Sequence, residues 1–226
     1  NLNNTFTIMV HLGMTGKIII TGADKKKYKT SFYYNLTDNK SKHDHLLLKF
    51  NKNILFTYND VRKFGFIKIL KTKKLYSSSH LYKLGPEPLS KKFNFHYFKN
   101  NIIKRQVCLK DLLMNQKFIA GLGNIYVNEA LFLSKINPKV RSNQIPLKKI
   151  KPLISNIKKV LKKAIQAGGS SIQNFNNIAG KKGKFQQFFN VYGKQGNFCS
   201  RPNCIGVIKR IWISNRSTFF CDKCQK

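Results

Sequence analysis

The sequence has few acidic residues for its length. Eight Asp and Glu residues stand against 43 Lys and Arg residues in 226, so the formal net charge is +35. Lys, Asn and Ile are abundant together, as biased codon usage produces, and we discount part of the charge on that ground. The remainder still exceeds what solubility requires and attracts polyanions over long distances, which indicates nucleic acid as the partner.

Two further absences narrow the class of protein. The sequence has no run of about eighteen apolar residues, which a membrane span needs, and no charged-then-apolar signal segment at its start. Only five cysteines are present, and four of them form two pairs near the end of the chain. That pattern is typical of metal ligation in a reducing compartment rather than of a secreted disulfide framework. We therefore expect a cytoplasmic, nucleoid-associated monomer with no membrane partner.

Arginine is scarce among the basic residues. Only six of the 43 are Arg, so each Arg stands where Lys was the commoner choice. A planar guanidinium fork binds phosphate in a geometry that Lys does not offer. Arg62, Arg105 and Arg216 are therefore candidates for specific contacts.

The first part of the chain predicts β structure. Short apolar runs rich in β-branched and aromatic residues alternate with turn residues. Strands are expected at residues 6–12, 17–21, 46–50, 54–58 and 64–70. Asn51-Lys52-Asn53 predicts a hairpin, and the polar, lysine-rich stretch 23–42 predicts an exposed loop.

From Phe93 onward the pattern becomes helical. Helices are expected at residues 105–115, 125–133 and 147–167, and the last has apolar residues at the i, i+3, i+4, i+7 spacing. Gly168-Gly169 predicts the end of that helix, and a Ser-, Asn-, Gly- and Lys-rich connector follows over 170–190.

The last segment carries a metal-ligand pattern. Cys199-x4-Cys204 and Cys221-x2-Cys224 supply four thiolates in two turns, and the residues between them alternate like a β-hairpin. All four positions are cysteine, so no coordination site is left for water and the pattern predicts one structural Zn²⁺. The alternative, reactive or disulfide cysteines, is weaker. Cys108 lies in an apolar stretch and receives no role.

Five short motifs occur in the order in which one enzyme family carries them. Each alone is weak, because a Gly-rich hexapeptide is usually only a turn, but together with the four cysteines they cover nearly the whole chain. The motifs are HLGMTG at 11–16, DVRKFG at 60–65, LGPEPL at 84–89, GLGNIY at 121–126 and RSTFFC at 216–221. On these residues the chain resembles formamidopyrimidine-DNA glycosylase.

The resemblance implies an α+β fold in three parts. A partial β-sandwich N-terminal domain would occupy residues 1–92, a helix–two-turn–helix DNA-binding domain with a mobile loop 93–190, and a C-terminal β-hairpin zinc finger 191–226. The activity implied is base-excision repair. A bifunctional glycosylase would excise oxidised purines, such as 8-oxoguanine and formamidopyrimidines, from double-stranded DNA and cleave the abasic site by β,δ-elimination.

The resemblance also assigns three residues to the hole that an excised base leaves. Met14, Arg62 and Phe64 match the family's apolar wedges and cation, which fill the emptied position in the base stack. Met14 lies between two glycines, Gly13 and Gly16, and Phe64 precedes a glycine, so both side chains could project from loop tips. Judged alone, Met14 and Phe64 would be ordinary packing residues.

Further residues match the family's contacts to the DNA backbone. They are His43, Arg62, Arg105, Asn124 and Arg216, and the family also credits Arg216 with assisting the elimination step. Judged alone, the Asn124 loop would be a plain helix connection, and His43 and Arg216 would be solvated surface residues. The segments 168–171 and 180–185 match the ends of a loop that in the family folds over the extruded base, although a helix cap and a basic linker explain them equally well.

The family's nucleophile is not found in these residues. The resemblance implies a proline amine at the N-terminus, an adjacent glutamate and a further lysine, and the chain instead starts at Asn1, with strand-like residues close behind it. We expect those groups to precede Asn1 and the isolated chain to bind duplex DNA without releasing a base.

Three alternative functions stay open at this point. The chain could be a noncatalytic DNA-binding module, or it could belong to the sibling family that removes oxidised pyrimidines. A ribosomal or RNA-binding zinc protein is the third, although it leaves Met14, Arg62 and Phe64 unexplained.

Overall fold

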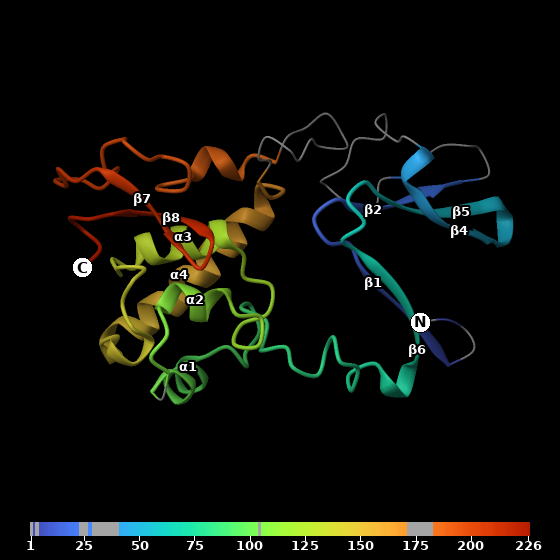
Figure 1. Cartoon of the computed structure of the whole chain (residues 1–226), viewed down its shortest axis with the longest axis horizontal. Coiled ribbons are helices and arrows are strands. Elements are labelled where there is room, and N and C mark those ends of the chain that lie inside the picture. Colours follow the sequence, from blue (N-terminus) through green and yellow to red (C-terminus); the bar gives the residue numbers. More distant parts are fainter. Residues whose placement is uncertain (1, 3–4, 23–26, 29–40, 104, 171–182) are drawn as a thin grey trace. The chain divides into compact units, whose positions relative to one another are not determined.

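A computed structural model of the chain describes residues 2, 5–22, 27–28, 41–103, 105–170 and 183–226. It divides into two compact units (Figure 1). The first comprises residues 1–82 and 167–186, and the second comprises residues 83–166 and 187–226. Each unit is described by itself below.

The first unit is built on a four-stranded antiparallel sheet with the order β3-β2-β5-β4. Its strands are β2 (Gly16–Thr21), β3 (Lys27–Tyr28), β4 (Asp44–Phe50) and β5 (Ile54–Asp60). The expected hairpin is confirmed: β4 and β5 pair through the short 3-10 turn η2 (Asn51–Asn53), in which Lys52 and Asn53 have positive φ angles of 60° and 54°. The predicted loop over 23–42 lies largely outside the described residues.

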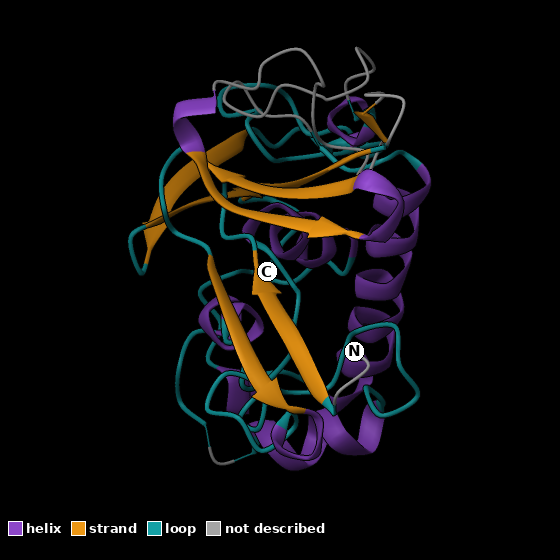
Figure 2. Cartoon of the chain, turned by 90° about the vertical axis from the view of Figure 1, so that its right-hand side faces the viewer, coloured by secondary structure: helices purple, strands orange, loops and turns teal. Residues whose placement is uncertain are grey.

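A separate two-stranded sheet joins β1 (Phe6–His11) to β6 (Phe66–Lys71) in antiparallel register. Figure 2 faces this unit and shows the strands in orange. The pairing places His11, the last residue of β1, opposite Phe66, the first residue of β6. The turn that follows β1 and the segment that precedes β6 therefore meet at the same end of this sheet. All five strands expected in this region are present, within two residues of their predicted bounds.

The second unit contains four α-helices and a β-hairpin. The helices are α1 (Phe95–Ile102), α2 (Leu109–Met114), α3 (Asn124–Leu133) and α4 (Leu147–Gln166). Additional 3-10 turns in the described parts of the chain are η1 (Ser41–His43), η3 (Thr72–Lys74), η4 (Ser142–Gln144) and η5 (Phe185–Phe188).

Two helix predictions need correction. The sequence pattern did not predict α1, and it placed the start of α2 at Arg105, four residues too early. The structure explains the late start of α2: residues 105–108 bond to 140–143 instead of forming a helical turn, as in Ser142 N to Val107 O at 2.9 Å and Leu109 N to Val140 O at 2.8 Å. This pairing joins segments more than thirty residues apart, so no local sequence pattern could predict it.

The predictions for α3 and α4 are confirmed. Residues Val127–Phe132 of α3 are all buried, and α4 buries one apolar stripe that includes Ile150, Leu153 and Ile157. Gly168 and Gly169 have φ angles of +69° and +81° and end α4, as the sequence predicted. No helix among the described residues is long and apolar enough to cross a membrane.

The hairpin of the second unit consists of β7 (Ile208–Ile213) and β8 (Arg216–Cys221). Ser214 and Asn215 connect the strands with φ angles of 46° and 59°, the left-handed pair that a tight two-residue hairpin turn requires. Near its base, Ile208 and Phe219 pack with Phe132 of α3, so the hairpin shares a core with the helices.

Candidate nucleic-acid interface and metal centre

In the first unit, a buried carboxylate joins the β1–β2 turn to the β5–β6 segment. Asp60 is 0% exposed, and its oxygens accept hydrogen bonds from Thr15 Oγ1 at 2.5 Å, Gly65 N at 2.9 Å, Tyr58 OH at 3.0 Å and Arg62 N at 3.3 Å. Burial alone raises the pKa of Asp60, but these hydrogen bonds to the charged form outweigh it and hold the pKa below 3.8. The carboxylate therefore fixes both segments as one structure.

Glycine is required where the two segments touch. A Cβ on Gly65 would stand 2.1 Å from the Tyr58 hydroxyl and 2.5 Å from the His11 carbonyl oxygen. Gly13 has a φ of +60°, and a Cβ there would lie 2.9 Å from the Phe64 backbone. Because the two backbones touch here, Met14 and Phe64, the neighbours of these glycines, lie at the tips of adjacent loops.

The three residues expected at the base stack do come together. The Arg62 guanidinium lies 4.4 Å from the centroid of the Phe64 ring, and its Nη1 lies 3.7 Å from Met14 Sδ. Met14 is 49% exposed and Phe64 57%. The arrangement presents a cation flanked by two apolar groups to solvent. Met14 and Phe64 are thus not buried in the core of the first unit.

In the second unit, the start of α3 holds the start of β8. Asn124 Nδ2 donates to the Ser217 carbonyl oxygen at 3.0 Å, and Lys110 Nζ of α2 donates to the same oxygen at 3.2 Å. Asn128, one turn further along α3, accepts from Phe219 N at 2.8 Å and donates to Asn124 O at 2.7 Å. Asn124 is thus oriented by the hairpin rather than left free on a helix connection.

Lys110 is the functional neighbour that sequence reasoning missed. Its side chain is buried at 1% exposure, and Nζ also donates to Thr218 Oγ1 at 2.5 Å. Burial lowers the pKa of Lys110 to about 8, which Arg216 also favours and Asp111 opposes. The one available signal was a lysine in the short, largely apolar segment LKDLLM, which also contains Asp111.

The remaining expected DNA contacts occupy separate places. Arg216 is exposed at the first position of β8, one residue before the Ser217 carbonyl that Asn124 and Lys110 share. Arg105 is half-buried, with its guanidinium 5.8 Å from the centroid of the Phe118 ring. His43 is half-buried in η1 of the first unit. The structure groups Asn124 with the Arg216 strand end. Of the loop whose ends match at 168–171 and 180–185, residues 171–182 lie outside the described residues.

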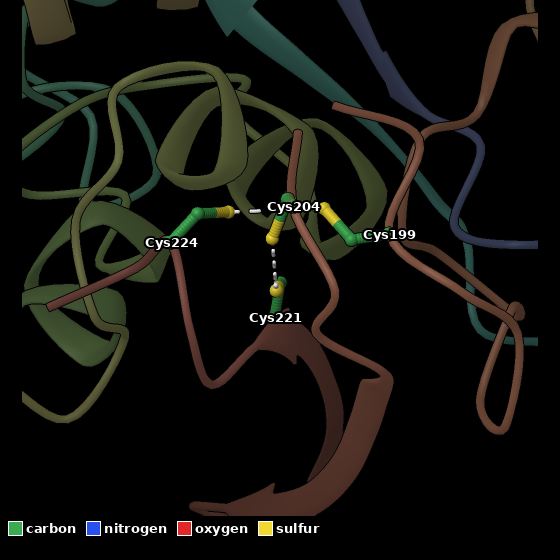
Figure 3. A group of neighbouring side chains, drawn as sticks. All are labelled: Cys199, Cys204, Cys221 and Cys224. Carbon is green, nitrogen blue, oxygen red and sulfur yellow. Dashed lines mark hydrogen bonds between the residues drawn. The ribbon is translucent and has the colours of Figure 1, made fainter. Parts of the chain in front are cut away.

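The four cysteines of the last segment converge (Figure 3). Their sulfur atoms all lie within 4.8 Å of one another, with 3.8 Å between Cys199 and Cys224 and 3.6 Å between Cys204 and Cys221. Burial and the adjacent thiols raise the pKa of Cys224 to about 12. A bound cation would offset that cost, so the donor set fits a soft metal ion coordinated by four thiolates.

The backbone around the cysteines is shaped for this convergence. Gly206 approaches so closely that a Cβ there would lie 2.5 Å from Cys221 Sγ. Gln225 Oε1 accepts from Cys221 N at 2.9 Å, while its Nε2 donates to Ile136 O at 2.8 Å. These bonds connect the cysteine cluster to the segment just after α3.

Glu129 makes a second tie. This α3 residue is 1% exposed, and its carboxylate accepts from Asn190 N, Asn190 Nδ2, Val191 N and Tyr192 N at 2.8–3.0 Å. A single acid in an apolar helix was the only sequence signal for it. It fixes where the segment leading to the cysteines begins.

A β-strand unit, two helices joined by a double turn, and a four-cysteine hairpin define the fold class of the helix–two-turn–helix DNA glycosylases. Family models agree: the formamidopyrimidine-DNA glycosylase N-terminal domain matches residues 1–67, and the formamidopyrimidine-DNA glycosylase H2TH domain matches residues 84–176.

Individual relatives lead to the same family. The chain is 38% identical over 226 residues to formamidopyrimidine-DNA glycosylase of Ruegeria sp. (strain TM1040), covering 100% of this chain and 78% of that protein. The protein of the same name from Rhodopseudomonas palustris (strain TIE-1) is 36% identical, with 100% and 79% covered. A Lactococcus lactis structure, in complex with DNA containing an abasic site, superposes with a TM-score of 0.80 at 37% identity and covers 99% of this chain and 76% of its own. The chain belongs to the formamidopyrimidine-DNA glycosylase family.

Proposed function

We propose that this chain serves in DNA base-excision repair, as part of a glycosylase and abasic-site lyase that acts on oxidised purines in double-stranded DNA. Its family membership supports the reaction, and two similar structures hold DNA containing an abasic site or Fapy-dG. The observation that carries the proposal is the exposed Arg62 guanidinium held between Met14 and Phe64.

These three residues would occupy the position that an extruded nucleotide leaves. An unstacked base leaves apolar base faces on both sides and an unpaired partner base with polar edges. Met14 and Phe64 offer apolar surface to the faces, and Arg62 offers donors to the edges. Asp60 would act as a positioning residue, since it fixes both segments without facing solvent.

Phosphates of the same DNA would be held mainly by the second unit. Asn124 lies at the first turn of α3, where backbone N–H groups and the helix dipole favour an anion. Arg216 would add a forked guanidinium beside it and assist the elimination step, and Arg105 and His43 would make further backbone contacts.

The four cysteines would hold one structural Zn²⁺. A set of four thiolates leaves no site for water or substrate, so the ion would stabilise the hairpin and take no part in the reaction. Although the first pair of cysteines has the wider Cys-x4-Cys spacing, all four sulfurs lie close together. Gly206, which has no side chain, leaves room for the Cys221 sulfur. A cytoplasmic, nucleoid-associated monomer, with domains at residues 1–92, 93–190 and 191–226, completes the proposal.

Comparison of binding to damaged and intact duplexes tests this function. We expect tighter binding to duplexes with one 8-oxoguanine or one abasic-site analogue, and Arg62→Ala should lower affinity for the abasic duplex about tenfold, as one charge-assisted hydrogen bond would. Lys49→Ala, which removes an equal charge from an exposed position on β4, is the matched control. Equal affinity of Arg62→Ala and the unsubstituted chain for every duplex, or tighter binding of structured RNA, would refute the proposal.

A further inference from the structure

The hairpin of the second unit exposes the only tryptophan of the chain. Trp212 on β7 is 65% exposed, whereas Ile213 next to it is 9% exposed. A large aromatic side chain left in water forgoes the stabilisation that burial would give it. None of the motifs discussed above includes this residue.

Arg210 holds the indole from one side. Its guanidinium carbon lies 4.8 Å from the centroid of the Trp212 ring and 5.9 Å from that of Phe219. Arg210 Nη2 also donates to Ser217 Oγ at 2.9 Å, and Ser217 lies directly opposite Trp212 in the hairpin register. The guanidinium is therefore fixed by three partners, and the ring is preorganised rather than loosely exposed.

The charges of the hairpin decide which partner fits. Arg210 shares the face of Trp212, and Lys209 and Arg216 alternate to the other face of the same two strands. Of these three, only Lys209 has an ion-pair partner among the described residues, Asp222 at 2.6 Å. Such a cationic surface repels a second copy of a chain whose net charge is +35. A flat aromatic ring beside a guanidinium instead suits a nucleotide. Its base has a π face for the ring, and its phosphate has a negative charge for the guanidinium.

The base must be unstacked on at least one face. Bases inside an intact duplex are covered by their neighbours, so an indole can stack only where the strand is gapped, frayed or single. The geometry points to Trp212 and Arg210 as a stacking site for an unstacked base of the DNA strand that Arg216 and Asn124 hold. This inference rests on the proposed function. It adds that the chain would bind gapped DNA, which strand cleavage produces, more tightly than intact duplex.

Intrinsic fluorescence tests the site directly, because all tryptophan emission comes from Trp212. The probes are an intact duplex, the same duplex with a one-nucleotide gap, and the single strand. We expect the gapped duplex and the single strand to quench the emission strongly and the intact duplex to quench it weakly. Trp212→Leu should weaken binding of the gapped duplex about tenfold and leave the intact duplex unaffected, whereas Trp212→Phe should retain most of the affinity.

Two controls separate the possible outcomes. Tyr76→Leu removes an aromatic side chain that is 82% exposed in the first unit and should change nothing, and metal content and circular dichroism check that the hairpin of each variant is folded. If Trp212→Leu binds the gapped duplex as tightly as the unsubstituted chain, or loses affinity for all three probes equally, the stacking site is overturned while the proposed function stands. If the unsubstituted chain binds none of the probes, both fail.

Discussion

Asp60 shows how one residue can determine the shape of a site without facing it. Four donors surround its carboxylate, one hydroxyl and one backbone N–H at each oxygen, and a neutral amide in its place would turn an N–H₂ group toward one such pair of donors. We expect Asp60→Asn to lower the free energy of unfolding by about 1–3 kcal/mol. Asp44→Asn, where the carboxylate accepts from Asn59, is the matched control and should cost less. Urea denaturation followed by circular dichroism measures both.

The same carboxylate predicts an acid sensitivity. Because its pKa is lowered on folding, the stabilisation is complete above the usual value of 3.8 and is lost as pH falls through the folded-state pKa. Asp60→Asn should therefore flatten the fall in stability below pH 3.8 relative to the unsubstituted chain. Parallel pH dependence in the two proteins would contradict this account.

Residue patterns predicted the site better than they predicted its supports. Met14, Arg62 and Phe64 could be selected because they lie in short motifs that resemble those of a known family. Lys110 and Glu129 could not, since their partners lie 107 and 61 residues away and only the folded chain brings them together. A buried charge within an apolar helix was the only trace that either left in the sequence.

At the scale of elements, Lys110 links α2 to β8. Its pKa is lowered to about 8 from 10.5, chiefly because burial disfavours the charged form. The unfolded chain therefore binds more protons between these values, so this residue makes stability rise with pH across the interval. We expect Lys110→Met to remove that rise, and the difference between the two proteins in denaturation from pH 8 to 10.5 measures it. A rise that persists in the variant would assign it to other groups.

Glu129 links α3 to the segment before the cysteines. Its carboxylate accepts four hydrogen bonds, and glutamine would replace one acceptor with an N–H₂ group facing donors. We expect Glu129→Gln to destabilise the second unit by about 2–3 kcal/mol. Asp111→Asn on α2, a half-buried acid of the same unit, controls for loss of a negative charge. Equal melting temperatures for the Glu129 variant and the unsubstituted chain would contradict the role of Glu129.

Elements whose pattern is local were predicted well, and those set by distant pairing were not. The apolar stripe of α4 and the Asn51-Lys52-Asn53 hairpin follow from local helical and turn patterns. The start of α2 was misplaced because residues 105–108 pair with 140–143, a bridge that no window of sequence contains. The bounds of a helix thus depend on which backbone groups already have partners elsewhere.

At the scale of the whole molecule, metal removal should act on one region. The hairpin shares one packed cluster with Phe132, Val191 and the four cysteines. We expect a strong chelator to change the emission of Trp212 and unfold the hairpin, while the circular dichroism of the strand unit stays largely unchanged. Cys204→Ser should reproduce the loss without chelator. Unchanged emission after complete removal of the metal would contradict a structural role for the ion.

The surplus of positive charge should make DNA binding strongly dependent on salt. Each phosphate neutralised releases counterions, so the logarithm of the binding constant falls with the logarithm of salt concentration at a slope of about −0.9 per contact. Arg216→Ala should reduce that slope by about one, because it removes one phosphate contact. Trp212→Leu should leave the slope unchanged while lowering affinity for gapped DNA, since stacking releases few ions. Titrations of both variants at several salt concentrations therefore separate contacts to phosphate from contacts to bases, and a slope unaffected by Arg216→Ala would remove Arg216 from the DNA backbone.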